Sequence, residues 1–164
     1  ADYIAEQLPD ELRYADPDLK PARATGEIDR AALERLKSTL PFAATLRDDL
    51  LHDWFGRFIT RYRNAQIPAP LDKPLSVEAF LKQLEGGAQL LRHPWSRLAW
   101  HRDKSTCTLY VSGAAYPATP ALAQALCEQR SHTPARKISA AERKLLLALV
   151  NDGHLIVRKS RQRR

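Results

Sequence analysis

The motif His101-Arg102-Asp103 is the arrangement of residues in this sequence that comes closest to a catalytic centre. A His-x-Asp pair, together with a distant histidine, forms the facial triad that holds non-haem iron(II). Here the motif falls between two short segments of alternating hydrophobicity, where an aspartate is typical of a hairpin turn. We therefore expect His101 and Asp103 to be structural, and we assign no catalytic, metal-binding or cofactor-binding residue to this chain.

The remaining histidines and both cysteines lack the spacing of metal ligands. Cys107 and Cys127 have no CxxC pattern, so we expect reduced, buried small apolar residues rather than a zinc site or a disulfide framework. The sequence contains no dinucleotide-binding, P-loop, α/β-hydrolase or zincin motif. The other histidines are scattered, and we expect surface or structural roles for them; they are His52, His93, His132 and His154.

Length and composition favour a folded protein: the chain has 164 residues, of which 44% are apolar and 27% charged. The N-terminus lacks a signal-peptide pattern, and the apolar run Leu145 to Val150 is too short to span a bilayer. We therefore expect a soluble, cytoplasmic protein with no membrane partner. Because the chain starts at Ala1 and contains no methionine, we also expect it to be a piece of a longer protein.

The net charge of +7 is concentrated at the C-terminus. Five basic residues there supply five of the seven units, so the preceding 157 residues are close to neutral. We expect nucleic-acid contact, if it occurs, through this tail only. The tail residues are Arg158, Lys159, Arg161, Arg163 and Arg164.

The first half of the sequence predicts helices. We interpret residues 1–26 as the end of a helix and a connector, and residues 27–66 as a helical region with apolar positions at helical spacing. The stripe around Trp54 is wide and aromatic, and the helical half has no sheet to cover it, so a partner subunit or a further domain is expected to do so. The residues assigned to this dimer interface are Leu33, Leu36, Leu40, Leu50, Leu51, Trp54, Phe55, Phe58 and Ile59.

The second half predicts a mixed domain. Residues 67–75 are proline-rich and form a stiff linker, residues 76–158 form the domain, and residues 159–164 form the basic tail. Ser76, Thr119 and Ser139 are predicted helix N-caps. Between the first two caps, alternating segments predict three strands with a short fourth, and residues 154–158 a closing strand. The fold class is therefore α+β, with a helical dimerisation region followed by a winged-helix-like domain that carries a small antiparallel sheet.

Several strings, taken in order, resemble the C-terminal region of the bacterial cupin or JmjC-like ribosomal oxygenases. They are RYADPDL with PARATGEID, DWFGRFITRYR, LLRHPWSRLAWHR with TLYVSGAAYPATPAL, and LLALVNDGHL. The resemblance covers nearly the whole chain, and it is the order of the strings, not any single one, that carries the identification.

The resemblance implies three parts in the parent protein: a catalytic barrel, dimerisation helices and a winged-helix domain. The barrel, which binds iron(II) and 2-oxoglutarate, has no counterpart here, so no cofactor is expected in this chain. The chain would be a non-catalytic dimerisation and substrate-contact fragment of a 2-oxoglutarate-dependent protein arginine hydroxylase. Its expected partners are a second copy of itself and the ribosomal protein that the parent modifies.

Two other functions remain open from the residues alone. A free-standing winged-helix protein would bind nucleic acid with Arg143 and Lys144 of residues 139–151 in a major groove. Against it, Leu145, Leu146 and Leu147 fill much of that helix. The third possibility is an adaptor that binds a protein partner and has no enzyme parent.

Overall fold

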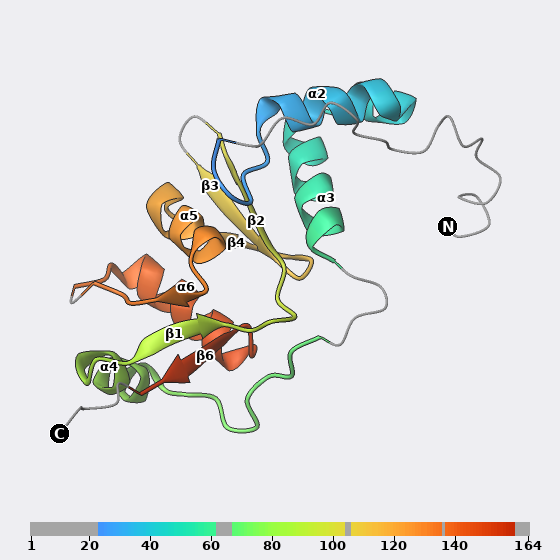
Figure 1. Ribbon diagram of the computed structural model, residues 1–164. Coiled ribbons are helices and arrows are strands. Elements are labelled where there is room, and N and C mark those ends of the chain that lie inside the picture. Colours follow the sequence, from blue (N-terminus) through green and yellow to red (C-terminus); the bar gives the residue numbers. More distant parts are fainter. Residues whose placement is uncertain (1–22, 62–66, 104–105, 136, 160–164) are drawn as a thin grey trace.

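The computed structural model describes residues 23–61, 67–103, 106–135 and 137–159, and it has the expected α+β class (Figure 1). In chain order the elements are α2 (Arg30–Thr39), the short 3-10 helix η2 (Pro41–Thr45), α3 (Asp48–Thr60), α4 (Val77–Glu85), β1 (Gln89–Arg92), β2 (Leu98–Arg102), β3 (Cys107–Val111), β4 (Ala114–Pro117), α5 (Pro120–Glu128), β5 (Ser131–His132), α6 (Ala140–Asn151) and β6 (Leu155–Arg158). No helix among these residues is long and apolar enough to cross a membrane.

Side-chain caps fix where the helices begin. The side chains of Ser76, Thr119 and Ser139 each accept a hydrogen bond from the backbone N–H three residues on, so all three predicted caps are confirmed. Ser139 forms a full capping box with Glu142. Asp29 caps α2 in the same way, and the helix therefore begins at Arg30, later than the expected start at residue 27.

The strands form two separate three-stranded sheets, where the sequence analysis expected one. The strands β2, β3 and β4 make the expected antiparallel meander. However, β1 pairs with the closing strand β6 on one side and with β5, which was not predicted, on the other. The single-sheet expectation was wrong because alternation identifies a strand but not its partner, and β6 lies more than sixty residues after β1.

Both faces of the β2–β3–β4 sheet are buried. In β3 the side chains of Cys107, Leu109 and Val111 lie in one core cluster, which is completed by α5, α6 and Phe80 of α4. Tyr110 points to the opposite face, where it packs with Leu51 of α3 and with residues of α2 in a second cluster. Figure 1 shows α3 and α5 on opposite sides of this sheet. The helical half therefore has a sheet to pack against, contrary to expectation.

The proline-rich linker is attached to the domain that follows it. The Leu71 N–H donates to the Asn151 carbonyl at 2.8 Å, and the Leu75 N–H donates to Asn151 Oδ1 at 2.8 Å. Asn151 Nδ2 in turn donates to the Leu75 carbonyl at 3.3 Å. Nearby, Gly153 adopts a φ of +79°, and a Cβ there would overlap the Ala69 carbonyl oxygen. Residues 67–75 thus run along the end of α6 as a fixed strap.

Candidate functional site

An aromatic patch lies on the face of α3 that points away from the sheet. It consists of Leu50, Trp54 and Phe58, which are 55%, 37% and 56% exposed and follow one another at four-residue intervals. The rings of Trp54 and Phe58 stack, with centroids 5.3 Å apart and planes 13° from parallel. We call these three residues the α3 patch.

The opposite face of α3 is held tightly against the sheet, and this contact decides which side chains are exposed. A Cβ on Gly56 would lie 2.5 Å from Cζ of the Tyr110 ring and closer still to two other ring carbons. Thr60 Oγ1 donates to the Gly56 carbonyl at 2.8 Å and accepts from the Gly113 N–H at 3.0 Å. Arg57 Nη1 reaches the Gly113 carbonyl at 3.4 Å. The α3 patch is therefore turned outward by contacts on the other side of the helix.

The nine residues of the predicted dimer interface fall into three groups that differ in solvent exposure. Leu33, Leu36 and Leu51 are at most 4% exposed and pack in the chain's own core, so they are not available on the surface as that prediction needs. Leu40, Phe55 and Ile59 are half-buried beside the same core. Only the three residues of the α3 patch are open to solvent. The helical periodicity correctly indicated burial, but a single sequence does not say whether the chain or a partner provides it.

The residues of the His101 motif make contacts within the chain's own fold. Because a carbonyl oxygen can only accept, the 2.9 Å contact between His101 Nδ1 and the Ile28 carbonyl places a proton on Nδ1. The ring stacks on His52 at 3.6 Å, and burial, followed by the neighbouring His101, lowers the pKa of His52. Asp103 donates its backbone N–H to the Thr106 carbonyl across the hairpin turn. Among the described residues, no three histidine, cysteine or carboxylate side chains are grouped to hold a metal.

Burial disfavours the ionised form of two thiols and one phenol in the core. Cys107 and Cys127 are free and buried, as expected from the sequence. Burial raises the pKa of both thiols, that of Cys127 to about 12, so the reactive thiolate form is suppressed. Burial also raises the pKa of Tyr110 to about 12.

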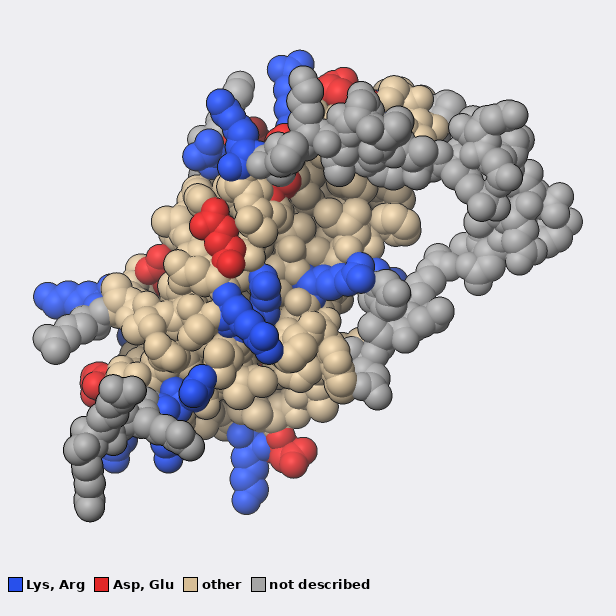
Figure 2. Space-filling view, viewed as in Figure 1, with Lys and Arg blue, Asp and Glu red and all other residues tan. Residues whose placement is uncertain are grey.

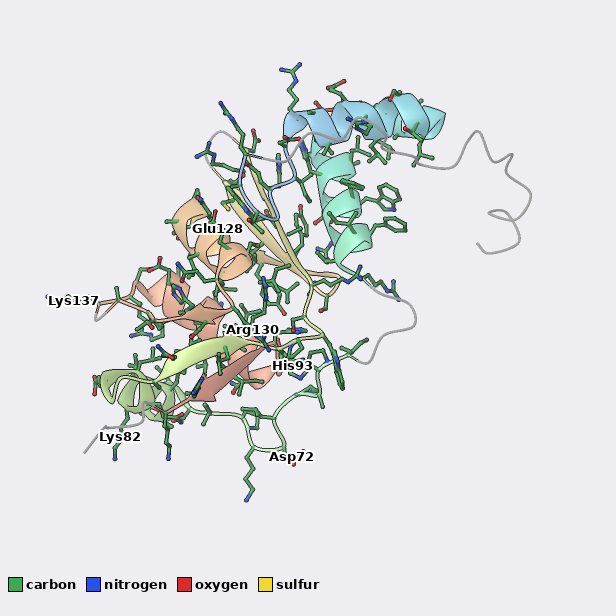
Figure 3. All side chains as sticks on the ribbon, viewed as in Figure 1. Asp72, Lys82, His93, Glu128, Arg130 and Lys137 are labelled. Carbon is green, nitrogen blue, oxygen red and sulfur yellow. The ribbon has the colours of Figure 1, made fainter. Side chains whose placement is uncertain are left out.

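A second feature is a group of exposed arginines from four different segments, of which only Arg158 is named as a possible contact residue from the sequence. Arg61 ends the α3 region and packs beside Gly113, and the neighbouring Ser112 N–H donates to the Arg97 carbonyl. The Arg130 carbonyl accepts from the Arg92 N–H, while Arg158 lies on β6 opposite Gln89 of β1. We call Arg61, Arg97, Arg130 and Arg158 the arginine band. Figure 2 shows basic side chains gathered across the middle of the face that is turned toward the viewer. Figure 3, drawn from the same side, places Arg130 in this region beside His93.

Arg92 lies among the residues of the band, but its side chain is used within the fold to bind the end of a helix. Its Nη1 donates to the carbonyls of Leu126 and Cys127 at the C-terminal end of α5, at 3.3 and 2.9 Å. A cation at this end of a helix satisfies free carbonyls and the helix dipole. Next to it, a hollow of about 400 Å³ is lined by Arg92, Ser96 and Arg97, among others. No local sequence motif identifies the band. Arg130 and Arg158 are distant from Arg97 in the sequence and come close to it only because their segments pair with β1.

Of the predicted tail contacts, Arg158 and Lys159 are exposed. Arg161, Arg163 and Arg164 lie outside the described residues.

Comparisons with known proteins agree with this geometry. A model of the ROXA-like winged helix family matches residues 29–156. A structure of Escherichia coli YcfD, a ribosomal oxygenase, in complex with cobalt and 2-oxoglutarate is 24% identical with a TM-score of 0.58; the match covers 95% of this chain and 43% of that one. An X-ray structure of the same E. coli protein is 25% identical with a TM-score of 0.57, and the match covers 96% and 42%.

The chain thus spans less than half the length of the solved structures that it resembles. A search of curated proteins gives no significant match. Since the family model covers most of the sequence, from the cap of α2 to the middle of β6, this chain belongs to the ROXA-like winged helix family.

Proposed function

We propose that this chain is the non-catalytic dimerisation and scaffolding region of a cytoplasmic, iron(II)- and 2-oxoglutarate-dependent ribosomal protein hydroxylase. Support comes from the likeness to YcfD, a ribosomal oxygenase whose structure holds cobalt and 2-oxoglutarate. In this proposal the winged-helix domain supports and orients a catalytic domain that the chain does not contain. The partners are a second copy of the chain and the ribosomal protein that the parent hydroxylates.

The observation that carries the dimerisation proposal is the α3 patch. Taking about 200 Å² for each large side chain, its three residues expose about 300 Å² of apolar surface per protomer. A symmetric pair of patches would bury about 600 Å², below the ~1,200 Å² of a stable interface. The half-buried neighbours Phe55 and Ile59 must therefore contribute to the dimer.

The oxygenase chemistry is assigned to the remainder of the parent because the donors in the described residues do not fit an iron centre. Nδ1 of His101 donates to the Ile28 carbonyl, and although His52 stacks on His101, the described residues contain no group of three side chains arranged to hold a metal. A facial triad needs two histidines and one carboxylate converging on one point. We therefore derive no catalytic step from this chain.

The oligomeric state tests the dimerisation proposal. Light scattering with size exclusion is expected to give a dimer for the 164-residue chain and a monomer for Trp54→Glu. Burying one unpaired carboxylate per protomer costs at least about 3 kcal/mol, which raises the dissociation constant more than a hundredfold. Ile67→Glu is the matched control, since Ile67 is 68% exposed and lies outside α3. A wild-type chain that stays monomeric at every concentration contradicts the proposal.

A turnover assay tests the non-catalytic assignment separately. Incubating the chain with iron(II), 2-oxoglutarate and ribosomal proteins is expected to give no succinate. Restoring the upstream catalytic domain is expected to produce succinate together with a hydroxylated ribosomal protein. Succinate formation by the chain alone, sensitive to His101→Ala, contradicts the assignment.

A further inference from the structure

We propose that the arginine band and the adjacent Trp95 form a binding surface for single-stranded RNA. The surface lies on the folded body of the chain, at the junction of the two sheets; it includes Arg158 of β6 but is distinct from residues 159–164 and from α6. It does not depend on dimerisation, because its residues lie outside the α3 patch.

The first argument is the chemistry of the band. All four residues are arginines, whose planar guanidinium groups bind phosphate oxygens in a bidentate manner. All four side chains are exposed. None of the ion pairs among the described residues involves Arg61, Arg130 or Arg158. Arg61, Arg130 and Arg158 therefore present positive charge that no carboxylate in the described part of the chain neutralises in an ion pair.

The second argument is an exposed aromatic side chain within the band. Trp95 lies two residues before Arg97, in the connection between β1 and β2, and is 49% exposed. Its backbone N–H donates to His93 Nδ1 at 3.2 Å, and the two rings meet edge to face with centroids 5.1 Å apart. The loop is also anchored on its buried side, because Ser96 Oγ lies 3.0 Å from Nδ1 of the buried His154. The indole is thus held on a rigid support.

Together these features match an unpaired nucleic acid strand. Arginines that follow the backbone, combined with an aromatic ring on which a base stacks, are the usual elements of single-strand recognition. A base within a duplex is already stacked and does not offer its face to Trp95. The positive charge of the band would repel a basic protein. We therefore do not assign this surface to the contact with a basic ribosomal protein. An acidic peptide would satisfy the arginines but makes no use of the indole.

The position of the band also relates it to the predicted contact residues of the basic tail. Arg158 belongs to the band and Lys159 follows it directly, so a strand bound along the band is directed toward the tail. By contrast, α6 buries Leu145, Leu146, Leu149 and Val150 in the core, which argues against its use as a groove-binding helix.

Fluorescence anisotropy with a labelled single-stranded uridine oligonucleotide of about 12 nucleotides tests the proposal. The full chain is expected to bind, with affinity falling as salt rises from about 50 to about 200 mM. Arg97→Gln/Arg130→Gln is expected to weaken binding at least about tenfold and to reduce the salt slope by about 1.4. Trp95→Ala is expected to weaken binding about tenfold, while Trp95→Phe retains most of it.

The matched control is Lys82→Gln/Arg102→Gln, which removes the same charge from exposed positions outside the band. Figure 3 shows Lys82 on α4, away from Arg130, and Arg102 lies about 16 Å from Arg97 along β2. The control variant is expected to bind nearly as the wild type does. Thermal melts of every variant establish that each one is folded.

Three results overturn the proposal. In the first, the control variant loses as much affinity as the band variant, so that only net charge matters. In the second, removing residues 160–164 abolishes binding and the band substitutions change nothing in the intact chain. In the third, a polyglutamate peptide of equal charge binds as tightly as the RNA, which makes the surface an acidic-peptide site. None of these results depends on whether the chain is a dimer.

Discussion

Replacing Gly56 by alanine is expected to destabilise the protein, although alanine is the better helix former. Gly56 lies in the middle of α3, where its missing side chain lets the helix backbone lie against the ring of Tyr110. The added Cβ would lie 2.5 Å from Cζ and closer to Cε2 and Cδ2, whereas carbon atoms normally approach to about 3.5–4.0 Å. Either the ring or the helix must move by about an ångström.

Neither can do so freely. Tyr110 is 2% exposed and belongs to the second core cluster, and α3 is tied to the β3–β4 turn through Thr60 and Gly113. Overpacking of this kind costs about 1–3 kcal/mol. The better helix propensity of alanine offsets about 1 kcal/mol of that cost. Because the added Cβ meets three atoms of a rigid, buried ring, the cost lies in the upper half of the overpacking range. A net loss of about 1–2 kcal/mol therefore remains, which lowers the melting temperature by roughly 2–8 °C in a chain of this size.

Thermal and urea unfolding of four variants, Tyr110→Leu alone among them, measures this effect. Gly56→Ala is compared with Gly86→Ala, where the glycine caps α4 with an ordinary φ of −72° and a Cβ would meet nothing closer than 3.3 Å. The Gly86 variant is expected to change stability by less than about 0.5 kcal/mol. Gly56→Ala/Tyr110→Leu, which removes the ring that the new methyl group meets, is expected to lose less than the sum of the two single losses.

The reasoning is refuted if Gly56→Ala is as stable as the wild type or more so. That result would mean that α3 does not lie against Tyr110 and that the outward direction of the α3 patch is not fixed by this contact. Strict additivity in the double variant would lead to the same conclusion.

Three further predictions concern the strap, a buried histidine and a cap. Asn151→Ala removes two hydrogen bonds to Leu75 and is expected to cost about 1–3 kcal/mol and to speed proteolysis within residues 67–75. Burial lowers the pKa of His154, so the unfolded chain binds the proton more readily than the folded one. Stability is therefore fully present above about pH 6.5 and is lost as the pH falls below it, which melting curves will show and His154→Gln will reduce. Ser139→Ala is expected to cost about 0.5–2 kcal/mol in urea unfolding, because the capping box with Glu142 is lost.

Each of these has a contrary outcome. Proteolysis of Asn151→Ala at the wild-type rate would show that the strap is held by other contacts. An unchanged pH profile in His154→Gln would assign the acid sensitivity to other groups. If Ser139→Thr, which keeps the hydroxyl, costs as much as the alanine variant, the cap hydrogen bond is not the cause.

Features that depend on neighbouring residues could be predicted from the sequence. The caps at Ser76, Thr119 and Ser139 were recognisable because the capping side chain and the N–H it accepts from are three residues apart. The strands around Trp100 and Leu109 were recognisable from alternation. In each case the physical cause lies within one short window of the chain.

Features that depend on distant pairing were not predictable. Nothing in residues 155–158 indicates that they pair with β1. Likewise, nothing in the sequence of the helical half indicates that Tyr110 packs against Leu51. The same limit applies to the candidate sites. The residues of the α3 patch belong to a larger set that the sequence predicts as a dimer interface, whereas the arginine band has no local signal because Arg97 and Arg130 belong to separate segments.

The central sheet also governs how the polypeptide can be divided. Because Ala99 and Tyr110 face the helices while Leu109 and Val111 face the winged-helix core, each β2–β4 strand contributes to two hydrophobic interiors at once. An expression fragment beginning at Ser76 would leave one of those interiors uncovered, and its amide protons in β3 would exchange faster than in the intact chain. The helices and the domain that follows them are thus expected to unfold in a single cooperative transition.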